Sequence, residues 1–367
     1  MTKRGAVTAR RVLWLCWLLA LGLRGLAATD TERVESSYAR GVYPRIASAL
    51  GRTVGRAPFS VAEAVVLAAS LVACVLMLRF MGRLRRCPDR RAALLAGLVA
   101  VVAVLGPVYL AFLLAWGLNY QRQPFAVSED LDARPASSAE LEGLCRRLVA
   151  EADEGRSAVE EDVAGVMRLP GGLASALGRA RTGLDAASHR HAALAGPVAP
   201  AKAVRLSAVL SYLGISGVFF PFTGEPNVNA TVPDPELPFV IAHEMAHQRG
   251  FAREDEANYI ASLACRLHAD PDFRYSGSLV ASVHALAALE GAAPATAHEL
   301  SRSRSEGVRR DLRALRAWSD RYRTPLRAVS GAVNDGYLRS QGQRDGVRSY
   351  GRMVDLLIAE ERAGRGR

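Results

Sequence analysis

Two histidines four residues apart, with a glutamate between them, lie in the segment 243–247, which reads HEMAH. On a helix this spacing stacks both imidazoles on one face, where each can reach a metal ion at about 2.0–2.1 Å. The pattern is that of zinc hydrolases, in which the glutamate takes a proton from a water molecule beside the metal. We therefore expect His243 and His247 to be zinc ligands and Glu244 to be the catalytic base.

A third ligand must come from outside this segment. In the longer pattern HExxHxxGxxH the third histidine would fall on Arg253, which cannot bind zinc. The next residue, Glu254, shares a helix face with mostly small residues that permit close helix packing, namely Ala257, Asn258, Ala261 and Ala264. Glu256 instead shares a face with bulky residues, namely Tyr259, Ile260 and Leu263. We expect Glu254 to be the third ligand, and Glu256 is the alternative.

The residues around HEMAH delimit a short helix at about 236–249. Asp234 is suited to cap its start, and Pro235 or Pro238 is suited to its first turn. Gly250 is suited to the left-handed conformation that ends a helix. The motif therefore falls in the last turns of a well-bounded helix.

Other polar residues have weaker claims on the site. Asn258, four residues after Glu254, is placed to accept a hydrogen bond from the second nitrogen of a metal-bound imidazole. The donor that a hydrolase needs for the oxyanion stays open among three candidates: Tyr350, Tyr275 and Arg274. His189 and His191 are interpreted as surface residues, and His284 and His298 as surface or core residues.

Three apolar stretches could cross a bilayer, which takes about 20 residues. They lie at about 12–28, 61–81 and 92–116. The first is short and ends in small residues, so a cleaved signal peptide is the alternative for it. The apolar run before His243 covers only residues 237–242, which argues against an intramembrane protease.

The positive charge of the chain is confined to the apolar part. Residues 1–121 hold 16 basic and 5 acidic residues, whereas residues 122–367 hold 31 of each. A nucleic-acid-binding domain would carry its excess charge on a folded face. Here the excess flanks the apolar stretches, so the sequence argues against nucleic acid and for the lipid bilayer as a partner.

Basic residues also predict the orientation. The short loop 83–91 contains five arginines, and the positive-inside rule places it and residues 1–11 in the cytoplasm. The loop 29–60 and everything after about residue 117 then lie on the other side. We expect a multi-pass protein of the cell membrane with an extracytoplasmic C-terminal domain.

Local patterns predict a mostly helical domain with little sheet. Ser137 followed by Glu140 is a capping-box signature that opens a helix to about residue 158. Strict alternation of polar and apolar residues over 227–232 predicts a half-buried strand that borders the cleft and pairs with an extended peptide. Residues 123–136 have the composition of a linker. Helical patterns cover the ranges 172–194, 253–268, 276–290, 295–321, 325–340 and 345–363.

The cysteines do not form a disulfide framework, because there are five and most fall in or between the membrane segments. Only Cys145 and Cys265 lie in the part expected outside the cytoplasm. Two buried free thiols are the simpler expectation for this pair, and a disulfide bond between them is the alternative.

Several stretches resemble a bacterial membrane-protein family of unknown function that is regarded as zinc-metallopeptidase-like. They are WGLNYQR (116–122), SYLGISGVFFPFTGEPNVN (211–229), HEMAHQRGFAREDEANYIA (243–261), VNDGYL (333–338) and GVRSYGRMVDLL (346–357). The resemblance covers nearly the whole chain and implies three membrane passes.

The segment HEMAH followed by EDEAN is also similar to metallopeptidases of the gluzincin type, whose third ligand is a glutamate in an ExxAD or ExxAN helix. This resemblance implies His243, His247 and Glu254 as ligands and Glu244 as the catalytic residue. Only six residues separate His247 from Glu254, which is fewer than in most peptidases with a glutamate ligand.

These patterns together predict a mainly α protein with a membrane region, residues 1–117, that contains the N-terminal transmembrane helices. An α+β zincin-like metallopeptidase domain with a small sheet or hairpin follows over residues 118–367. We expect zinc-dependent hydrolysis of a peptide or protein substrate. The alternative is a non-catalytic, metal-stabilised membrane scaffold that binds a partner, and the oligomeric state stays open.

Overall fold

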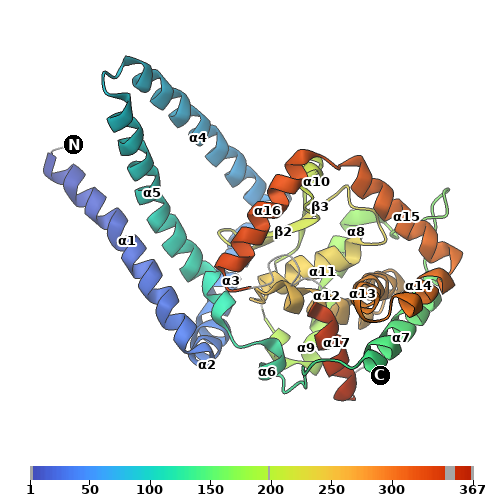
Figure 1. Cartoon of the computed structure of the whole chain (residues 1–367). Coiled ribbons are helices and arrows are strands. Elements are labelled where there is room, and N and C mark those ends of the chain that lie inside the picture. The colour runs from blue at the N-terminus through green and yellow to red at the C-terminus, as the bar shows by residue number, and fades with distance from the viewer. Residues whose placement is uncertain (1–2, 197–198, 344–351, 365–367) are drawn as a thin grey trace.

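The computed structural model describes residues 3–196, 199–343 and 352–364 of the chain (Figure 1). Three of its helices project from the rest of the molecule: α1 (Lys3–Thr29), α4 (Val61–Arg86) and α5 (Arg90–Ala115). Each contains a stretch long and apolar enough to cross a membrane, which agrees with the predicted multi-pass membrane protein. Helices α4 and α5 form a hairpin, and their apolar side chains are largely exposed, as lipid-facing residues should be.

The first span packs along the third. The indole nitrogen of Trp17 in α1 donates to the carbonyl of Val102 in α5 at 2.7 Å, and the two rings of Trp17 and Tyr109 lie 5.6 Å apart. Arg24 donates to the Tyr109 hydroxyl at 3.1 Å. These contacts join the first span to the third within the described part of the chain.

The stretch between the first two spans, expected as a loop, is mostly helical and packs on the C-terminal part. It contains α2 (Thr31–Arg33), a π-helix η1 (Val34–Val42) and α3 (Tyr43–Val54). Buried Glu35 accepts two hydrogen bonds of 2.8 Å from buried Arg122. Removing one partner of such a buried ion pair typically costs about 3–5 kcal/mol, so this contact fixes the segment on the domain.

The sheet has three strands in the order β1-β3-β2. The central strand β3 (Glu225–Asn229) is parallel to β1 (Lys202–Val204) and antiparallel to β2 (Gly217–Phe220). All five residues of β3 are buried, so the predicted half-buried strand over 227–232 is wrong in its burial and in its end. The polar side chains of β3 are buried because they are satisfied: Asn229, for example, donates to the Ile215 carbonyl at 2.9 Å.

The topology also corrects the predicted role of this strand. Both edges of β3 are paired, so it cannot pair with an extended peptide. In the described part of the chain, β1 and β2 are the edge strands of this sheet.

Helix α4 begins directly on the sheet. The buried carboxylate of Glu225 accepts hydrogen bonds from the main-chain N–H groups of Val61 and Ala62, at 3.1 and 2.7 Å, and from Lys202 at 2.6 Å. A negative charge is favourable at a helix N-terminus, where these N–H groups have no partner within the helix. The second span is therefore attached to the domain at its first turn.

Helices make up most of the C-terminal part, as predicted. The predicted helix after the capping box is α7 (Ser138–Ser157), and the reciprocal Ser137–Glu140 hydrogen bonds are present. The expected single helices 172–194 and 295–321 are each divided, into α8 (Gly172–Arg179) and α9 (Arg181–Arg190), and into α14 (Pro294–Ser303) and α15 (Glu306–Arg321). The second division follows from the extended backbone of Arg304 and from Ser305, which caps α15.

The remaining predicted helices lie close to their expected ranges. They are α11 (Leu237–Gln248), α12 (Glu254–Arg266), α13 (Pro271–Ala292), α16 (Pro325–Ser340) and α17 (Met353–Arg362), and the start of the range 345–363 lies outside the described residues. The short elements are η2 (Gly117–Gln121), α6 (Phe125–Ser128) within the expected linker, η3 (Ala192–Leu194) and α10 (Ser207–Leu213). Helices α11, α12 and α13 pack together at the centre of the domain (Figure 1).

The two cysteines of this domain, Cys145 and Cys265, are both buried free thiols. We predict that both react with a thiol reagent after the protein is unfolded without reductant, and that neither reacts in the folded protein. Burial raises the pKa of both thiols, which further suppresses the reactive thiolate. Mass spectrometry of the labelled peptides measures this, and an unlabelled Cys145–Cys265 pair would show a disulfide bond instead.

Candidate metal centre

Helix α11 carries the HEMAH segment and ends as predicted. Pro238 lies in its first turn, and Gly250 follows it with a φ of +88°, a conformation that favours glycine. The predicted cap is wrong: the Asp234 side chain instead accepts a hydrogen bond from the N–H of Leu169 at 2.8 Å. The residue at the cap position is Glu236, whose side chain makes no capping bond.

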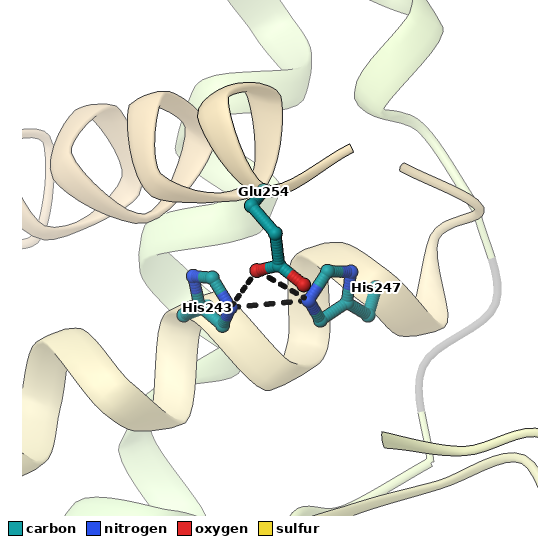
Figure 2. A group of neighbouring side chains, drawn as sticks. All are labelled: His243, His247 and Glu254. Carbon is teal, nitrogen blue, oxygen red and sulfur yellow. Dashed lines mark hydrogen bonds and ion pairs between the residues drawn. The ribbon is translucent and has the colours of Figure 1, made fainter. Parts of the chain in front are cut away.

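The structure brings the three predicted ligand side chains together (Figure 2). The Nε2 atoms of His243 and His247 lie 3.0 Å apart, and Oε2 of Glu254 lies 3.3 Å from the first and 3.5 Å from the second. One ligand atom from each residue falls within 4.8 Å of the others. This is a group of two imidazole nitrogens and one carboxylate oxygen that could hold a metal ion.

Glu254 reaches the histidines because it is the first residue of α12, and α12 packs closely on α11. The residues of α12 at the predicted contact face are small and buried: Ala257, Ala261 and Ala264. The alternative ligand Glu256 points elsewhere, since its Oε1 accepts hydrogen bonds from the N–H of Phe125 at 2.7 Å and from Arg253 at 3.0 Å. The geometry therefore favours Glu254 over Glu256.

The second nitrogens of the two imidazoles differ in their surroundings. Nδ1 of His247 donates to the carbonyl of Phe251 at 2.7 Å, which leaves Nε2 with its lone pair directed at the group. Nδ1 of His243 is buried and has no hydrogen-bond partner among the described residues. We expected Asn258 to accept this hydrogen bond. For His247, the acceptor is instead the main-chain carbonyl of Phe251.

Opposite charges control protonation within the group. Burial lowers the pKa of His247, but the carboxylates of Glu254 and Glu244 outweigh it and raise that pKa to about 9. Burial raises the pKa of Glu254, but His247 and His243 outweigh it and hold that pKa well below its usual range. A metal ion competes with protons for the same nitrogen lone pairs, so metal binding would release protons.

Glu244 lies beside the group and against the edge strand β2. It is buried, and Oε2 has no hydrogen-bond partner in the described part of the chain. Its pKa is raised above the usual value, mainly by burial, although the two histidines and the main-chain N–H of Phe219 act in the opposite direction. A Cβ atom at Gly217 would lie 2.5 Å from Oε1 of Glu244, so only glycine allows β2 to approach this side chain so closely.

Of the three residues considered for the oxyanion, two are placed elsewhere. Tyr275 is fully buried in α13, where its hydroxyl donates to Asp311 at 2.5 Å. Arg274 donates to the carbonyl of His268 at 3.0 Å. Tyr350 lies outside the described residues.

One of the histidines interpreted as surface residues is in fact buried. His191 is fully buried, and its Nδ1 lies 2.8 Å from a carboxylate oxygen of Glu129. Its neighbour His189 is at least partly exposed, as expected. Neither belongs to the group of His243, His247 and Glu254.

Two residues that no sequence motif connects with the site lie within its electrostatic reach. Burial raises the pKa of Tyr337 in α16 to about 12, and the charge of Glu254 contributes to this rise. Burial lowers the pKa of His284 in α13 to about 4, with a contribution from His243. Tyr337 also shares a hydrogen bond of 3.2 Å with Tyr120. Tyr337 and Tyr120 lie in the stretches VNDGYL and WGLNYQR, which carry the family resemblance. No local periodicity connects these stretches to HEMAH.

The end of the third span supports α11 directly. The indole N–H of Trp116 donates to the carbonyl of His247 at 3.0 Å, and its ring packs edge-on against that imidazole at 6.1 Å. Tyr43, from the segment between the first two spans, donates to the carbonyl of Gln248 at 2.6 Å. The membrane region therefore positions the helix that carries the candidate ligands.

Comparison with known proteins gives a family without an activity. No curated protein and no solved structure matches the chain significantly. One family model matches residues 38–358, which include the last two candidate spans and all three residues of the candidate metal group. The chain belongs to this family, which is described as a protein of unknown function (DUF3810).

Proposed function

We propose that this protein is a membrane-anchored, zinc-dependent peptidase. The observation that carries the proposal is the group His243, His247 and Glu254 with the buried carboxylate of Glu244 beside it. Three protein ligands of the types nitrogen, nitrogen and oxygen are typical of catalytic zinc sites, which keep a fourth position open. Structural zinc sites usually have four protein ligands and are rich in cysteine, and both cysteines of this domain lie outside the group.

The residues of this chain have separate roles in the proposed reaction. When bound, the zinc ion would polarise the scissile carbonyl and lower the pKa of the attacking water. Glu244 accepts the proton of that water and passes it to the leaving amine. The carbonyl of Phe251 orients His247 through Nδ1, so that Nε2 is the atom that would hold the metal.

Strand β2 supplies the surface for an extended substrate. In the described part of the chain its outer edge pairs with no other strand, and Glu244 lies directly beneath Gly217. A peptide that pairs with this edge would bring its main chain past Glu244 and the metal group. The substrate-binding strand that we proposed from the sequence is thereby transferred from β3 to β2.

Metal analysis and peptide cleavage test this function together. The full-length protein is purified in detergent, because residues 29–60 pack against the domain and must be retained. We expect about one zinc per chain and cleavage of a peptide library that a chelator abolishes and added zinc restores. A zinc-free protein that cleaves no peptide after zinc addition would contradict the proposal.

The orientation predicted from the basic loop requires its own test. We predict that a reporter fused after residue 120 is active only if it is a reporter that functions outside the cytoplasm. A reporter fused within the loop 83–91 should be active only if it functions in the cytoplasm, and it serves as the control. The reverse pattern would place the candidate metal centre in the cytoplasm.

A further inference from the structure

Helix α16 has its apolar residues on the outside. Among the residues of α16, Leu338 is the only buried one. Leu326, Val329 and Val333 are 52%, 60% and 68% exposed, and the partly exposed Tyr337 follows them. Their spacing of three, four and four residues places all of them on one face of the helix.

The face of α16 that contacts the domain is more polar. Arg327 donates to the carbonyl and the hydroxyl of Ser319, at 3.1 and 2.9 Å, and Asn334 lies two turns further along the same face. A helix that lies on a protein in water has the opposite arrangement, with its apolar face inward. Packing of Leu338 alone does not stabilise a helix of this length, because most helical stability in proteins comes from burial of an apolar face.

Contacts at both ends of α16 place it beside the membrane spans. At its C-terminal end, Arg24 of α1 donates to the carbonyl of Ser340 as well as to Tyr109 of α5. At its N-terminal end, α16 packs against α10. The start of α10 is held by Glu63, in the first turn of α4, which accepts a hydrogen bond from the N–H of Leu206 at 2.7 Å. Figure 1 shows α16 on the side of the domain that faces the three spans.

The exposed apolar surface continues from α16 onto α10. Three large side chains at or in α10 are about half exposed: Leu206, Val209 and Tyr212. Several large exposed apolar side chains on two helices that pack together indicate an interaction site rather than a water-facing surface. Exposed arginines lie near the two ends of α16, where Arg323 pairs with Asp320 at 2.6 Å and Arg339 pairs with Asp335 at 2.7 Å, so these ends are polar while the face between them is apolar.

We propose that the outer face of α16, together with α10, is buried in the boundary between head groups and acyl chains of the bilayer that the spans cross. The lipid surface is the occupant because α16 contacts α1 through Arg24 and the start of α10 contacts the first turn of α4 through Glu63, and the ends of these spans define where the bilayer begins. An interfacial helix of this kind lies roughly 5–10 Å into that boundary. This inference concerns lipid contact alone and does not depend on the proposed peptidase activity.

Fluorescence quenching of a label at position 333 tests this proposal. The accessible cysteines Cys16, Cys74 and Cys87 are replaced by alanine in the full-length protein, and Val333→Cys is labelled with an environment-sensitive dye. The protein is reconstituted into vesicles of phosphatidylcholine and phosphatidylglycerol. We expect quenching by lipids brominated on the acyl chains and loss of quenching by aqueous iodide.

The matched control is Ala328→Cys. Ala328 is also exposed on α16 but lies about 140° around the helix axis from Val333. We expect iodide, and not the brominated lipids, to quench this label. Equal iodide quenching of both labels would overturn the proposal. A label at position 333 that is protected from iodide but not quenched by the lipids would also overturn it, since a protein partner or a second copy would then cover the face.

Discussion

The variant His243→Ala is expected to lose its bound zinc and all zinc-dependent cleavage. The alanine removes one of three ligands, and the remaining pair, His247 and Glu254, cannot retain the ion against exchange during purification. Metal content per chain, measured on the full-length protein in detergent, gives the result directly. Added zinc should also raise the melting temperature of the wild-type protein and not that of the variant, because a ligand that binds only the folded state stabilises it.

Two further variants separate the candidate third ligands. Glu254→Ala should lose zinc as His243→Ala does, because its Oε2 lies 3.3 and 3.5 Å from the two imidazoles. Glu256→Ala should keep its zinc, because Glu256 binds the N–H of Phe125 and Arg253 instead. Stoichiometric zinc in His243→Ala would contradict the site, and loss of zinc from Glu256→Ala alone would make Glu256 the ligand.

The candidate metal group was predictable because its determinants are local. A spacing of four residues brings His243 and His247 onto one face of any helix. The small residues of the next helix indicated that Glu254, rather than Glu256, would meet them, and the buried contact of Ala257, Ala261 and Ala264 agrees with this. The apolar length of the spans likewise needs no knowledge of tertiary structure.

The errors arise where distant parts of the chain decide the environment. Alternation in β3 suggested one wet face, but Ser60 donates to Asn227 at 2.6 Å across a sequence distance of 167 residues, and such satisfied polar groups can be buried. The sequence alone predicts a loop for residues 29–60, since neither periodicity nor composition shows that Glu35 pairs with Arg122. The hydrogen bond of 3.2 Å between Tyr120 and Tyr337 depends in the same way on how α16 lies across the domain.

The variant Glu244→Gln separates a peptidase from a scaffold. Glutamine fills the same volume and can still form hydrogen bonds, but it cannot accept a proton from the attacking water. We expect the fold and the zinc content to be unchanged and the rate of hydrolysis to fall by about 10²–10⁴-fold, which is the usual worth of a general base. Zinc analysis and chelator-sensitive cleavage measure the two properties on the same sample.

Gly217→Ala tests the same carboxylate without altering it. The added Cβ would lie 2.5 Å from Oε1 of Glu244, so either the side chain or strand β2 must shift. The three atoms nearest to this methyl group all belong to Glu244. The candidate metal ligands, on α11 and α12, are not among them. We therefore expect the zinc to be retained while hydrolysis decreases, as in Glu244→Gln. Gly291→Ala is the control, because nothing lies within 4 Å of its added methyl group.

Complementation of a deletion strain extends this comparison to the cell. A peptidase requires the proton acceptor, so Glu244→Gln should fail to complement even when it carries its full zinc content. A scaffold requires only the fold and the metal, so the same variant should complement fully while His243→Ala does not. Full complementation by zinc-loaded Glu244→Gln protein would end the peptidase proposal. The carboxylate of Glu244, which hydrolysis needs and the fold does not, would then be dispensable.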